Sequence, residues 1–445
     1  MNPTPDQAAT SYVLHSANEL DVKFIRLWFT DILGTLKGFA ITIDELEEVL
    51  VRGATIDGSS IAGFARSDES DMIAMPDPST WQLLPWRPRE NAVARMFCDI
   101  LRPDGTPFEG DPRHVLRRNI QHASDIGYSF YVGPELEYFY LEDSDSVVPI
   151  DQGGYFDQTA ADGGPDLRRE TVLSLEELGI PVAHSHHEVA PGQHEIDLRH
   201  QNALTMADTV ITYRVVVKEI ASHHGVYASF MPRPMNDQNG SGMHCHLSLA
   251  KGERNAFYDE DDGLHLSAEG RSFLAGLIRH SPEITAVTNQ WVNSYKRLVP
   301  GIEAPAYSVW TGGNWGDLVR VPPYQGRAEA VRIEYRAPDS ACNPYLAFSV
   351  MLAAGIKGME EGYDLGDPVT QDLEDMSPSE RLDAGISRLP SNLGQALDLL
   401  KGSELVREAL GDSVFDNFIR NKEIEWREFE ATVTGYEVDR YLKVL

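Results

Sequence analysis

The chain has 445 residues and carries 69 aspartates and glutamates against 38 lysines and arginines, which gives a formal net charge of −31. This length accommodates a large core in two or three domains, and the hydrophobic fraction of 42% and charged fraction of 24% are typical of a soluble globular protein. So large a negative charge argues against nucleic acid or an anionic membrane as a partner.

The cysteines and the N-terminal residues indicate in which cellular compartment the protein is expected. Cys98, Cys245 and Cys342 are isolated and show no CxxC spacing, which fits a reducing cytosol and provides no disulfide framework. Residues 1–10, which we expect to be disordered, contain neither the basic segment nor the apolar run of a secretory signal. No apolar run is long enough to cross a bilayer. We therefore expect a cytoplasmic protein with no nucleic-acid or membrane partner.

The first hundred residues predict a small α+β unit, because helical and period-two patterns alternate there. Arg102-Pro103-Asp104-Gly105-Thr106-Pro107 is the clearest linker. We place the domain boundary there, giving an N-terminal domain of residues 1–105 and a larger domain of residues 106–445. The predicted helices of the first domain span residues 7–20 and 43–51, and its predicted strands span residues 22–29, 35–43, 81–86 and 92–100.

The larger domain is predicted to begin with a helix that Asp111-Pro112 caps and to end in a run of helices. Strands that carry charged side chains lie between the helices. The predicted helices span residues 113–126, 167–178, 204–223, 343–363, 392–401, 404–410 and 415–432.

A predicted strand at residues 133–140 carries two carboxylates in an otherwise apolar run. Successive side chains of a strand point to opposite faces, so Glu135 and Glu137 share one face while Leu136 and Tyr138 share the other. Two adjacent carboxylates that lack partners would be costly to bury. A divalent cation held by oxygen ligands is the natural partner for them.

Three further stretches follow the same pattern. His244, His246 and Ser248 fall on one face of a strand, the segment 332–336 places two arginines and a carboxylate on one face, and the segment 188–195 has a glutamate at each side of a turn. A solvated strand face explains any one of these pairs, but four such stretches favour one polar cavity that binds metals and an anionic substrate. Carboxylates with an occasional histidine suit Mg²⁺ or Mn²⁺ better than Zn²⁺.

The sequence offers few alternatives to that chemistry. His184, His186 and His187 could indicate a zinc site, but no cysteine is near, and packed or exposed histidines are the simpler interpretation. A Walker A loop and a dinucleotide glycine fingerprint are absent from the sequence. The charged residues favour phosphoryl transfer with acyl activation, which requires metals, cations and accurate positioning.

Several long motifs resemble those of type I glutamine synthetases, and within that family the second paralogue of actinobacteria. The resemblance covers essentially the whole chain after the first ten residues. The motifs occur in the family's order, at residues 57–61, 69–72, 133–137, 188–195, 239–246, 293–301, 303–305 and 332–339.

This resemblance implies an α+β fold with an N-terminal β-grasp domain and a larger catalytic domain, whose curved antiparallel sheet forms a half-barrel flanked by helices. It also implies a homo-oligomer of two stacked hexameric rings, a dodecamer, with each active site between neighbouring subunits. The implied activity is an ATP-dependent ligation of an amine to L-glutamate.

The resemblance also implies a role for each matching residue. Two or more Mg²⁺ or Mn²⁺ ions would bind in each site, and ATP would be a co-substrate. Glu137, Glu188 and Glu195 would hold one metal, and Glu135, His244 and Glu334 the other.

Arg297 and Arg336 would bind the glutamate carboxylates with Asn239 and Gly240. His246, Ser248, Arg320 and Arg332 would serve the nucleotide and its phosphates. Glu303, on a flap, would take a proton, and Asp57 of the neighbouring subunit and Asp71 would bind ammonium.

Trp315 is a departure from the family, which usually has an arginine there that clamps the transferring phosphoryl group. Arg66 occupies a position that mediates feedback by glutamine in one branch, or it is an ordinary surface residue. The resemblance leaves three functions open: ligation of glutamate to ammonia, ligation to a larger amine that gives the γ-glutamyl amide of a polyamine or a monoamine, and a non-catalytic homologue. The intact carboxylates argue against the third.

Overall fold

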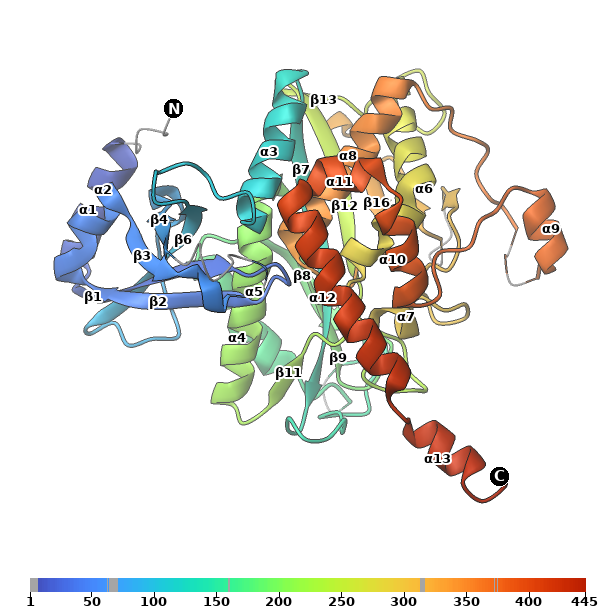
Figure 1. Ribbon diagram of the computed structural model, residues 1–445, viewed down its shortest axis with the longest axis horizontal. Helices are drawn as coiled ribbons and strands as arrows, with labels where there is room; N and C mark the ends of the chain where they lie inside the picture. The colour runs from blue at the N-terminus through green and yellow to red at the C-terminus, as the bar shows by residue number, and fades with distance from the viewer. Residues whose placement is uncertain are drawn as a thin grey trace.

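The computed structural model describes residues 7–61, 63, 71–158, 161–312, 317–371, 373 and 375–445. Arg66 and Trp315 lie outside the described residues. The molecule is α+β, with a small N-terminal β-grasp domain beside a large domain (Figure 1). No helix in the described ranges is long and apolar enough to cross a membrane.

The small domain packs two helices against a six-stranded sheet of order β2-β1-β6-β4-β3, in which β5 also pairs with β6. Strands β1 and β6 are parallel and the other pairs are antiparallel. The strand expected at residues 81–86 shortens to two residues, because Pro85 has no N–H with which to continue a ladder. The elements are α1 (Gln7–Glu19), β1 (Val22–Thr30), β2 (Leu36–Thr42), α2 (Leu46–Arg52), β3 (Ala54–Asp57), β4 (Asp71–Pro76), β5 (Gln82–Leu83) and β6 (Ala92–Leu101).

The large domain is built on a curved ten-stranded sheet, a half-barrel, of order β14-β15-β16-β12-β7-β9-β8. The short strands β10 and β11 pair with β7, and β13 pairs with β12. The strands are β7 (Ser129–Leu141), β8 (Val182–His187), β9 (Gln193–Leu198), β10 (Gln201–Asn202), β11 (Tyr227–Ser229), β12 (Met243–Lys251), β13 (Arg254–Asn255), β14 (Trp310–Thr311), β15 (Val319–Arg320) and β16 (Ile333–Tyr335).

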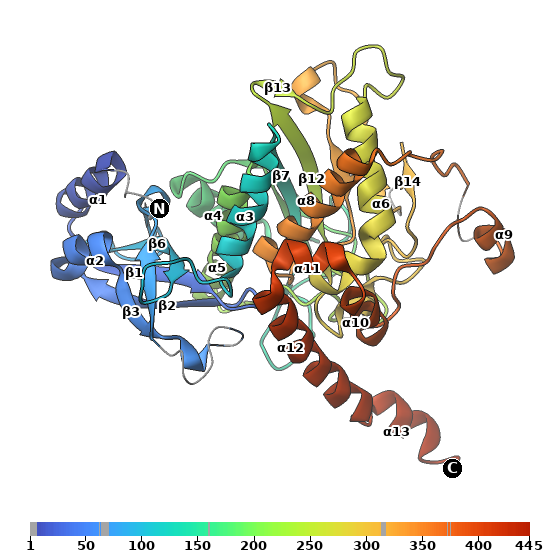
Figure 2. The same ribbon diagram turned by 45° about the horizontal axis from the view of Figure 1, so that its top comes forward.

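Helices cover one face of this sheet and leave the other open (Figures 1 and 2). Leu136, Tyr138, Cys245 and Leu247 point to the covered face and join one large buried cluster with the helices. The helices are α3 (Pro112–Asp125), α4 (Pro165–Glu177), α5 (Ala203–His223), α6 (Ala268–Thr288), α7 (Ser294–Arg297), α8 (Pro344–Glu361), α9 (Pro378–Asp383), α10 (Leu393–Lys401), α11 (Glu404–Leu410), α12 (Asp412–Ala431) and α13 (Gly435–Tyr441).

Buried polar contacts join the two domains. Arg113 of α3 forms a bidentate pair with Asp208 of α5, at 3.0 and 2.9 Å, and also reaches Asp77 and Asp99 of the small domain. The turn between β1 and β2 enters the large domain, where Asn343 Nδ2 donates to the carbonyl of Ile32. Burial of these groups without partners would be costly, so the two domains are fixed relative to each other.

Candidate active site

The register of the large sheet brings the polar residues of separate strands into rows on the open face. Glu135 of β7 lies opposite His244 of β12, and Glu137 lies opposite Glu195 of β9. Across the next pairs, His186 of β8 lies opposite Glu195, and Glu334 of β16 lies opposite His246. Since side chains alternate along each strand, these rows face the cavity while the apolar residues between them enter the core.

A cavity of about 510 Å³ opens on this face of the sheet. Six carboxylates line it against two arginines, so most of its wall is negatively charged. The lining residues are Glu135, Glu137, Tyr155, Phe156, His184, His186, Glu188, Val189, Gln193, Glu195, Asp197, Asn239, Gly240, His244, Arg297, Ile302, Glu303 and Arg336.

Glu135, His244 and Glu334 form one group of potential metal ligands, with one atom of each lying within 4.8 Å of the others. Burial raises the pKa of Glu135, but the neighbouring imidazoles of His246 and His244, at 2.5 and 3.5 Å, outweigh it and hold that pKa well below its usual range. Burial likewise raises the pKa of Glu334, and His246, Arg336 and His244 outweigh it, so the net shift is downward. Both carboxylates are therefore ionised at neutral pH.

Glu188, Glu195 and His186 form a second group within the same 4.8 Å limit. Burial and the nearby charge of Glu137 raise the pKa of Glu188 to about 8. Burial, Asp197 and Glu137 raise the pKa of Glu195 well above its usual range. These carboxylates therefore have too little positive charge around them to be ionised together.

Glu137 lies in the same cavity but outside both groups. Its Oε2 accepts hydrogen bonds from Gln193 Nε2 at 2.9 Å and from the N–H of Gly242 at 3.0 Å, and its Oε1 is 3.8 Å from His244 Nε2. The structure thus places His186 in one group with Glu188 and Glu195, while Glu137 adds its charge to theirs.

The donor sets suit divalent cations. Buried carboxylates that repel each other need a cation to be ionised, and oxygen ligands with one imidazole per group fit Mg²⁺ or Mn²⁺.

Next to His244, the wall of the cavity is cationic. Arg297 is buried, and its guanidinium donates to the main-chain carbonyls of Arg336, Ala337 and Pro338 at 3.1, 2.8 and 3.2 Å. These contacts orient the group without neutralising it, since carbonyls carry no net charge. The side chain of Arg336 reaches Glu334 from the same segment. This wall can bind an anion.

The comparisons with known proteins cover the whole chain. The sequence profile of the glutamine synthetase beta-Grasp domain matches residues 21–103, and that of the glutamine synthetase catalytic domain matches residues 109–441. The chain is 52% identical to a glutamine synthetase of Mycolicibacterium smegmatis, over 97% of this chain and 99% of the relative. It is 49% identical to a glutamine synthetase of Methanosarcina mazei, over 97% of each chain.

The chain belongs to the glutamine synthetase family. Among solved structures, a GmaS/ADP complex is similar with a TM-score of 0.88 and 31% identity, covering 97% of this chain and 99% of that one.

The flap residue expected from the glutamine synthetase family lies at the cavity. Glu303 has a φ of +53°, which is unusual for a residue other than glycine and indicates local strain. Its Oε2 accepts a hydrogen bond of 2.8 Å from Asn239 Nδ2. Asn239 thus tethers this segment across the cavity.

The residues expected at the nucleotide lie next to the cavity rather than in its lining. Arg332 Nε donates to His246 Nδ1 at 3.1 Å, so the proton of that ring lies on Nε2 and points at Glu135. Arg320 Nε lies 3.3 Å from Glu334 Oε2. Ser248 is half-buried on β12, where it pairs with Tyr131.

Asp57 and Asp71 do not line the cavity. They face each other across the β3–β4 pair of the small domain, and both are exposed. The Asp57 carboxylate accepts hydrogen bonds from the hydroxyl and the N–H of Ser59 at 2.6 and 2.9 Å, and the first of these is the main cause of the lowered pKa of Asp57. Neither residue takes part in the site within a single chain.

Sequence reasoning missed one wall of the cavity, formed by Tyr155, Phe156, His184, His186 and Asp197. The two aromatic rings are stacked with centroids 4.1 Å apart, and each meets His186 edge-on. His184 Nε2 lies 2.5 Å from Asp197. His187 points to the other face of β8, so the three histidines do not converge on one zinc ion. The loop that carries the aromatic rings has no periodic pattern that would have revealed it.

Proposed function

We propose that this chain is an ATP-dependent ligase that joins an amine to the γ-carboxylate of L-glutamate through a γ-glutamyl phosphate, with ammonia as the default amine. One observation supports this most strongly: in a member of the glutamine synthetase family, a single cavity combines two groups of carboxylate and imidazole ligands with a buried cationic wall. The γ-carboxylate is a poor electrophile until it is phosphorylated, after which an amine can attack it.

The cationic wall is proposed to bind glutamate. Arg297 and Arg336 would pair with its carboxylates, with Arg336 also proposed as a catalytic residue, and Asn239 and Gly240 would complete the site. The buried position of Arg297 supports this, because a charge-assisted hydrogen bond is stronger where water is excluded.

Two divalent cations, Mg²⁺ or Mn²⁺, are proposed to bind beside that wall. Glu137, Glu188 and Glu195 would hold one, and Glu135, His244 and Glu334 the other. When bound, such ions offset the charge of the phosphate oxygens.

His246, Ser248, Arg320 and Arg332 are proposed to bind ATP, with Arg320 also near the transferred group. The similarity to a GmaS/ADP complex supports nucleotide binding by this chain.

Glu303 is proposed to accept a proton from the attacking amine, which reacts only when it is unprotonated. The flap would also exclude water, which would otherwise hydrolyse the acyl phosphate. Asp57 and Asp71 would bind the ammonium ion. Because neither lines the cavity of its own chain, the proposal requires that a neighbouring subunit supplies Asp57, together with Asp71, which faces it across the β3–β4 pair.

A homo-oligomer, a dodecamer of two hexameric rings in this proposal, is also supported by the C-terminal helices. Figures 1 and 2 show the C-terminal end of α12 and the following α13 projecting from the body of the molecule. The exposed side chains there include Tyr436, Val438, Leu442 and Val444. An apolar surface of this kind is typical of a subunit contact.

A phosphate-release assay with glutamate, ATP and a panel of amines that includes ammonia tests the proposal. Amine-dependent release of phosphate with formation of an amide supports it. No turnover with any amine, in protein that binds Mg²⁺ and ATP, would favour a non-catalytic homologue.

A larger amine is the second candidate, and the aromatic wall favours it. Tyr155 and Phe156 are 55% and 56% exposed beside the carboxylates of Glu188, Asp197 and Glu303. Aromatic faces next to carboxylates attract alkylammonium groups, by about 0.5–2 kcal/mol for each cation–π contact. The rings would therefore accommodate an amine with a carbon chain.

Trp315, although outside the described residues, provides a test of that candidate. Loss of an arginine that stabilises a transferred phosphoryl group can cost about a thousandfold or more in rate. If the larger amine is the substrate, turnover with ammonia is poor, and Trp315→Arg raises it while lowering the rate with the best amine. Ready use of ammonia by the wild type and no effect of Trp315→Arg would leave plain glutamine synthesis.

A further inference from the structure

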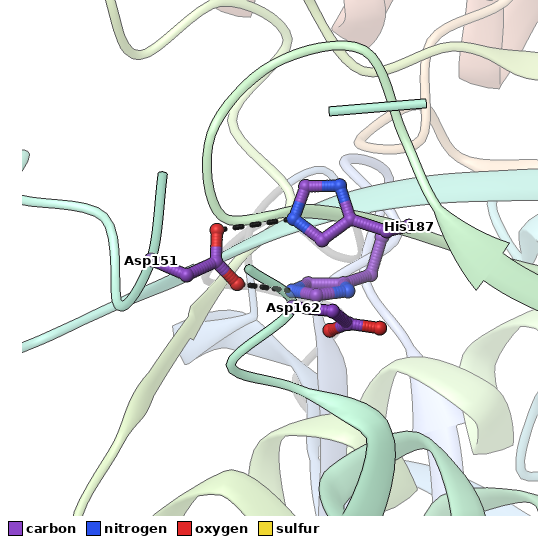
Figure 3. Close-up of side chains that lie close together, drawn as sticks. Asp151, Asp162 and His187 are labelled. Carbon is purple, nitrogen blue, oxygen red and sulfur yellow. Dashed lines mark hydrogen bonds and ion pairs between the residues drawn. The ribbon is translucent and has the colours of Figure 1, made fainter. Parts of the chain in front are cut away.

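A buried polar cluster lies behind the cavity, between the loop 150–164 and the turn that joins β8 to β9. Figure 3 shows Asp151, Asp162 and His187 there, with the Asp151 carboxylate directed at the His187 ring. The Asp151 side chain is only 5% exposed, and His187 is fully buried. These three residues are not among those proposed to bind the metals, glutamate, ATP or the amine.

Asp151 binds four separate points of the backbone and side chains around it. Its Oδ1 accepts hydrogen bonds from His187 Nε2 at 3.0 Å, the Gly192 N–H at 2.8 Å and the Gly153 N–H at 3.2 Å. Its Oδ2 accepts one from the Gly163 N–H at 2.7 Å. Two of these donors belong to the loop 150–164, one to His187 at the end of β8 and one to the β8–β9 turn, so one carboxylate joins the loop to the segment 187–192.

The cluster resembles a metal site, because Asp151, Asp162, His187 and His194 offer atoms within 4.8 Å of one another. Arg168, however, already supplies the positive charge. Its guanidinium pairs with Asp162 and donates to His194 Nδ1 at 2.7 Å. An arginine can only donate, so the neutral His194 ring has its proton on Nε2 and no lone pair there for a metal. A divalent ion would also lie beside the guanidinium, so we assign a structural role to these four residues.

Both segments that Asp151 joins contribute to the cavity. His187 Nδ1 lies 2.6 Å from the Glu188 carbonyl, next to a proposed metal ligand. The Phe156 N–H donates to the His187 carbonyl at 3.1 Å. Phe156 has a φ of +61°, a strained conformation that surrounding contacts must maintain. The Asp151–His187 pair thus supports Glu188 on one side and the aromatic wall on the other.

We propose that Asp151 and His187 are positioning residues that fix the metal ligands of the β8–β9 turn and the amine-side wall of the cavity together. This proposal rests on the proposed function, which identifies the aromatic wall as the side that binds the amine. The prediction for Mn²⁺ binding can be tested without turnover. The glutamate side, formed by Arg297 and Arg336, lies on other elements and is independent of the pair.

The test is Asp151→Asn in the full-length chain. An amide accepts through one oxygen only, and in either orientation its NH₂ group faces an N–H donor that the carboxylate accepted. Outer-shell partners of metal ligands typically contribute about 10–100-fold in metal affinity. We expect the dissociation constant for Mn²⁺, measured by electron paramagnetic resonance without substrates, to rise by about that factor. We also expect the KM for the amine to rise while the KM for glutamate is unchanged.

Asp143→Asn is the matched control. Asp143 accepts the N–H groups of Asp145 and Ser146 in an exposed turn of the same β7–α4 connection, and it does not line the cavity. This variant should bind Mn²⁺ and the amine as the wild type does.

Normal Mn²⁺ affinity and amine KM in folded Asp151→Asn protein would overturn the proposal, as would an equal rise in the KM for glutamate. If Asp151→Asn does not fold, His187→Gln decides, since glutamine keeps a donor toward Asp151 and loses the one toward the Glu188 carbonyl. Weaker Mn²⁺ binding by His187→Gln supports the proposal, and unchanged binding overturns it. If the wild type shows no turnover but Asp151→Asn weakens Mn²⁺ binding as expected, the proposed function is contradicted and the positioning role is not.

Discussion

Individual carboxylates in this cavity are held in unequal protonation states by their neighbours. Glu135 is surrounded by two imidazoles and stays ionised, whereas Glu188 and Glu195 face Glu137 and Asp197 and resist ionisation. The difference follows from the register, since β12 brings histidines beside β7 and β9 brings acids. The negative end of the site therefore requires a cation to become fully charged.

The pH dependence of stability follows from Glu188. Its pKa is about 8 in the metal-free fold and near 4.5 when exposed in the unfolded chain. The folded state therefore binds more protons between these values, and the stability that this group contributes is greatest below pH 4.5 and is lost as the pH rises to about 8. We expect the free energy of unfolding of metal-free protein to fall between pH 5.5 and 8 by an amount on the order of a few kcal/mol. The Tm should fall with it. Saturating Mg²⁺ should remove much of this loss, and Glu188→Gln should reduce the slope in EDTA. An identical slope in the variant would contradict the assignment.

Arg297 offers a second test at the scale of one residue. A lysine in its place cannot reach three carbonyls and an anion at once, because it lacks the planar fork of donors. Loss of a charge-assisted hydrogen bond costs about 1.5–3 kcal/mol. We therefore expect Arg297→Lys to raise the KM for glutamate about tenfold or more. Arg420→Lys, on the exposed side of α12, is the control. Unaltered glutamate kinetics in Arg297→Lys would exclude this residue from the glutamate site.

At the scale of the elements, strands were predicted from the sequence more successfully than loops. The period-two pattern placed Glu135 and Glu137 on one face of β7 and His244 and His246 on one face of β12, as the structure has them. Helix α6 was not predicted, and Pro282 in its interior interrupts the helical pattern in the sequence. Strand pairing is a long-range property, so the short strands β3 and β4 were also missed.

Loop residues at the site could not be predicted from the sequence, for a different physical reason. Phe156 reaches the cavity through a left-handed backbone conformation, and Asp151 binds donors up to 41 positions away along the chain. Neither feature produces a periodic pattern. Only the folded arrangement of the β7–α4 connection reveals the aromatic wall and the cluster behind it.

The flap segment carries a testable prediction at this scale. Asn239 holds Glu303 by one hydrogen bond of 2.8 Å at a partly exposed position, which contributes about 1 kcal/mol. Asn239→Ala should therefore open the flap more often and admit water to the acyl phosphate. We expect more phosphate released per amide formed than in the wild type, with Asn236→Ala on the same loop as the control. A phosphate-to-amide ratio that stays at one in Asn239→Ala would show that this contact does not close the site.

On the scale of the whole molecule, the domain arrangement separates residues that the proposed reaction requires together. The ion pairs of Arg113 with Asp77 and Asp99 and the hydrogen bond from Asn343 to Ile32 fix the small domain against the large domain. Asp57 is exposed on that small domain and absent from the cavity lining. Because the interface between the domains is buried and polar, a large rearrangement within one chain would be costly. A second subunit is the simpler source of the missing carboxylate.

Mixed oligomers test this shared site. In a ring in which each site takes Asp57 from one subunit and its metal ligands from the next, Asp57→Ala and Glu334→Ala subunits are each inactive alone. Co-expressed in equal amounts, they form some interfaces in which both contributions are intact, about a quarter of the total for random assembly. We expect about that fraction of the wild-type activity in purified mixed rings. Co-expression of Glu334→Ala with Glu195→Ala is the control, since both residues belong to the large domain and no interface is restored. Mixed rings of Asp57→Ala and Glu334→Ala that remain inactive would show that Asp57 does not act across the interface.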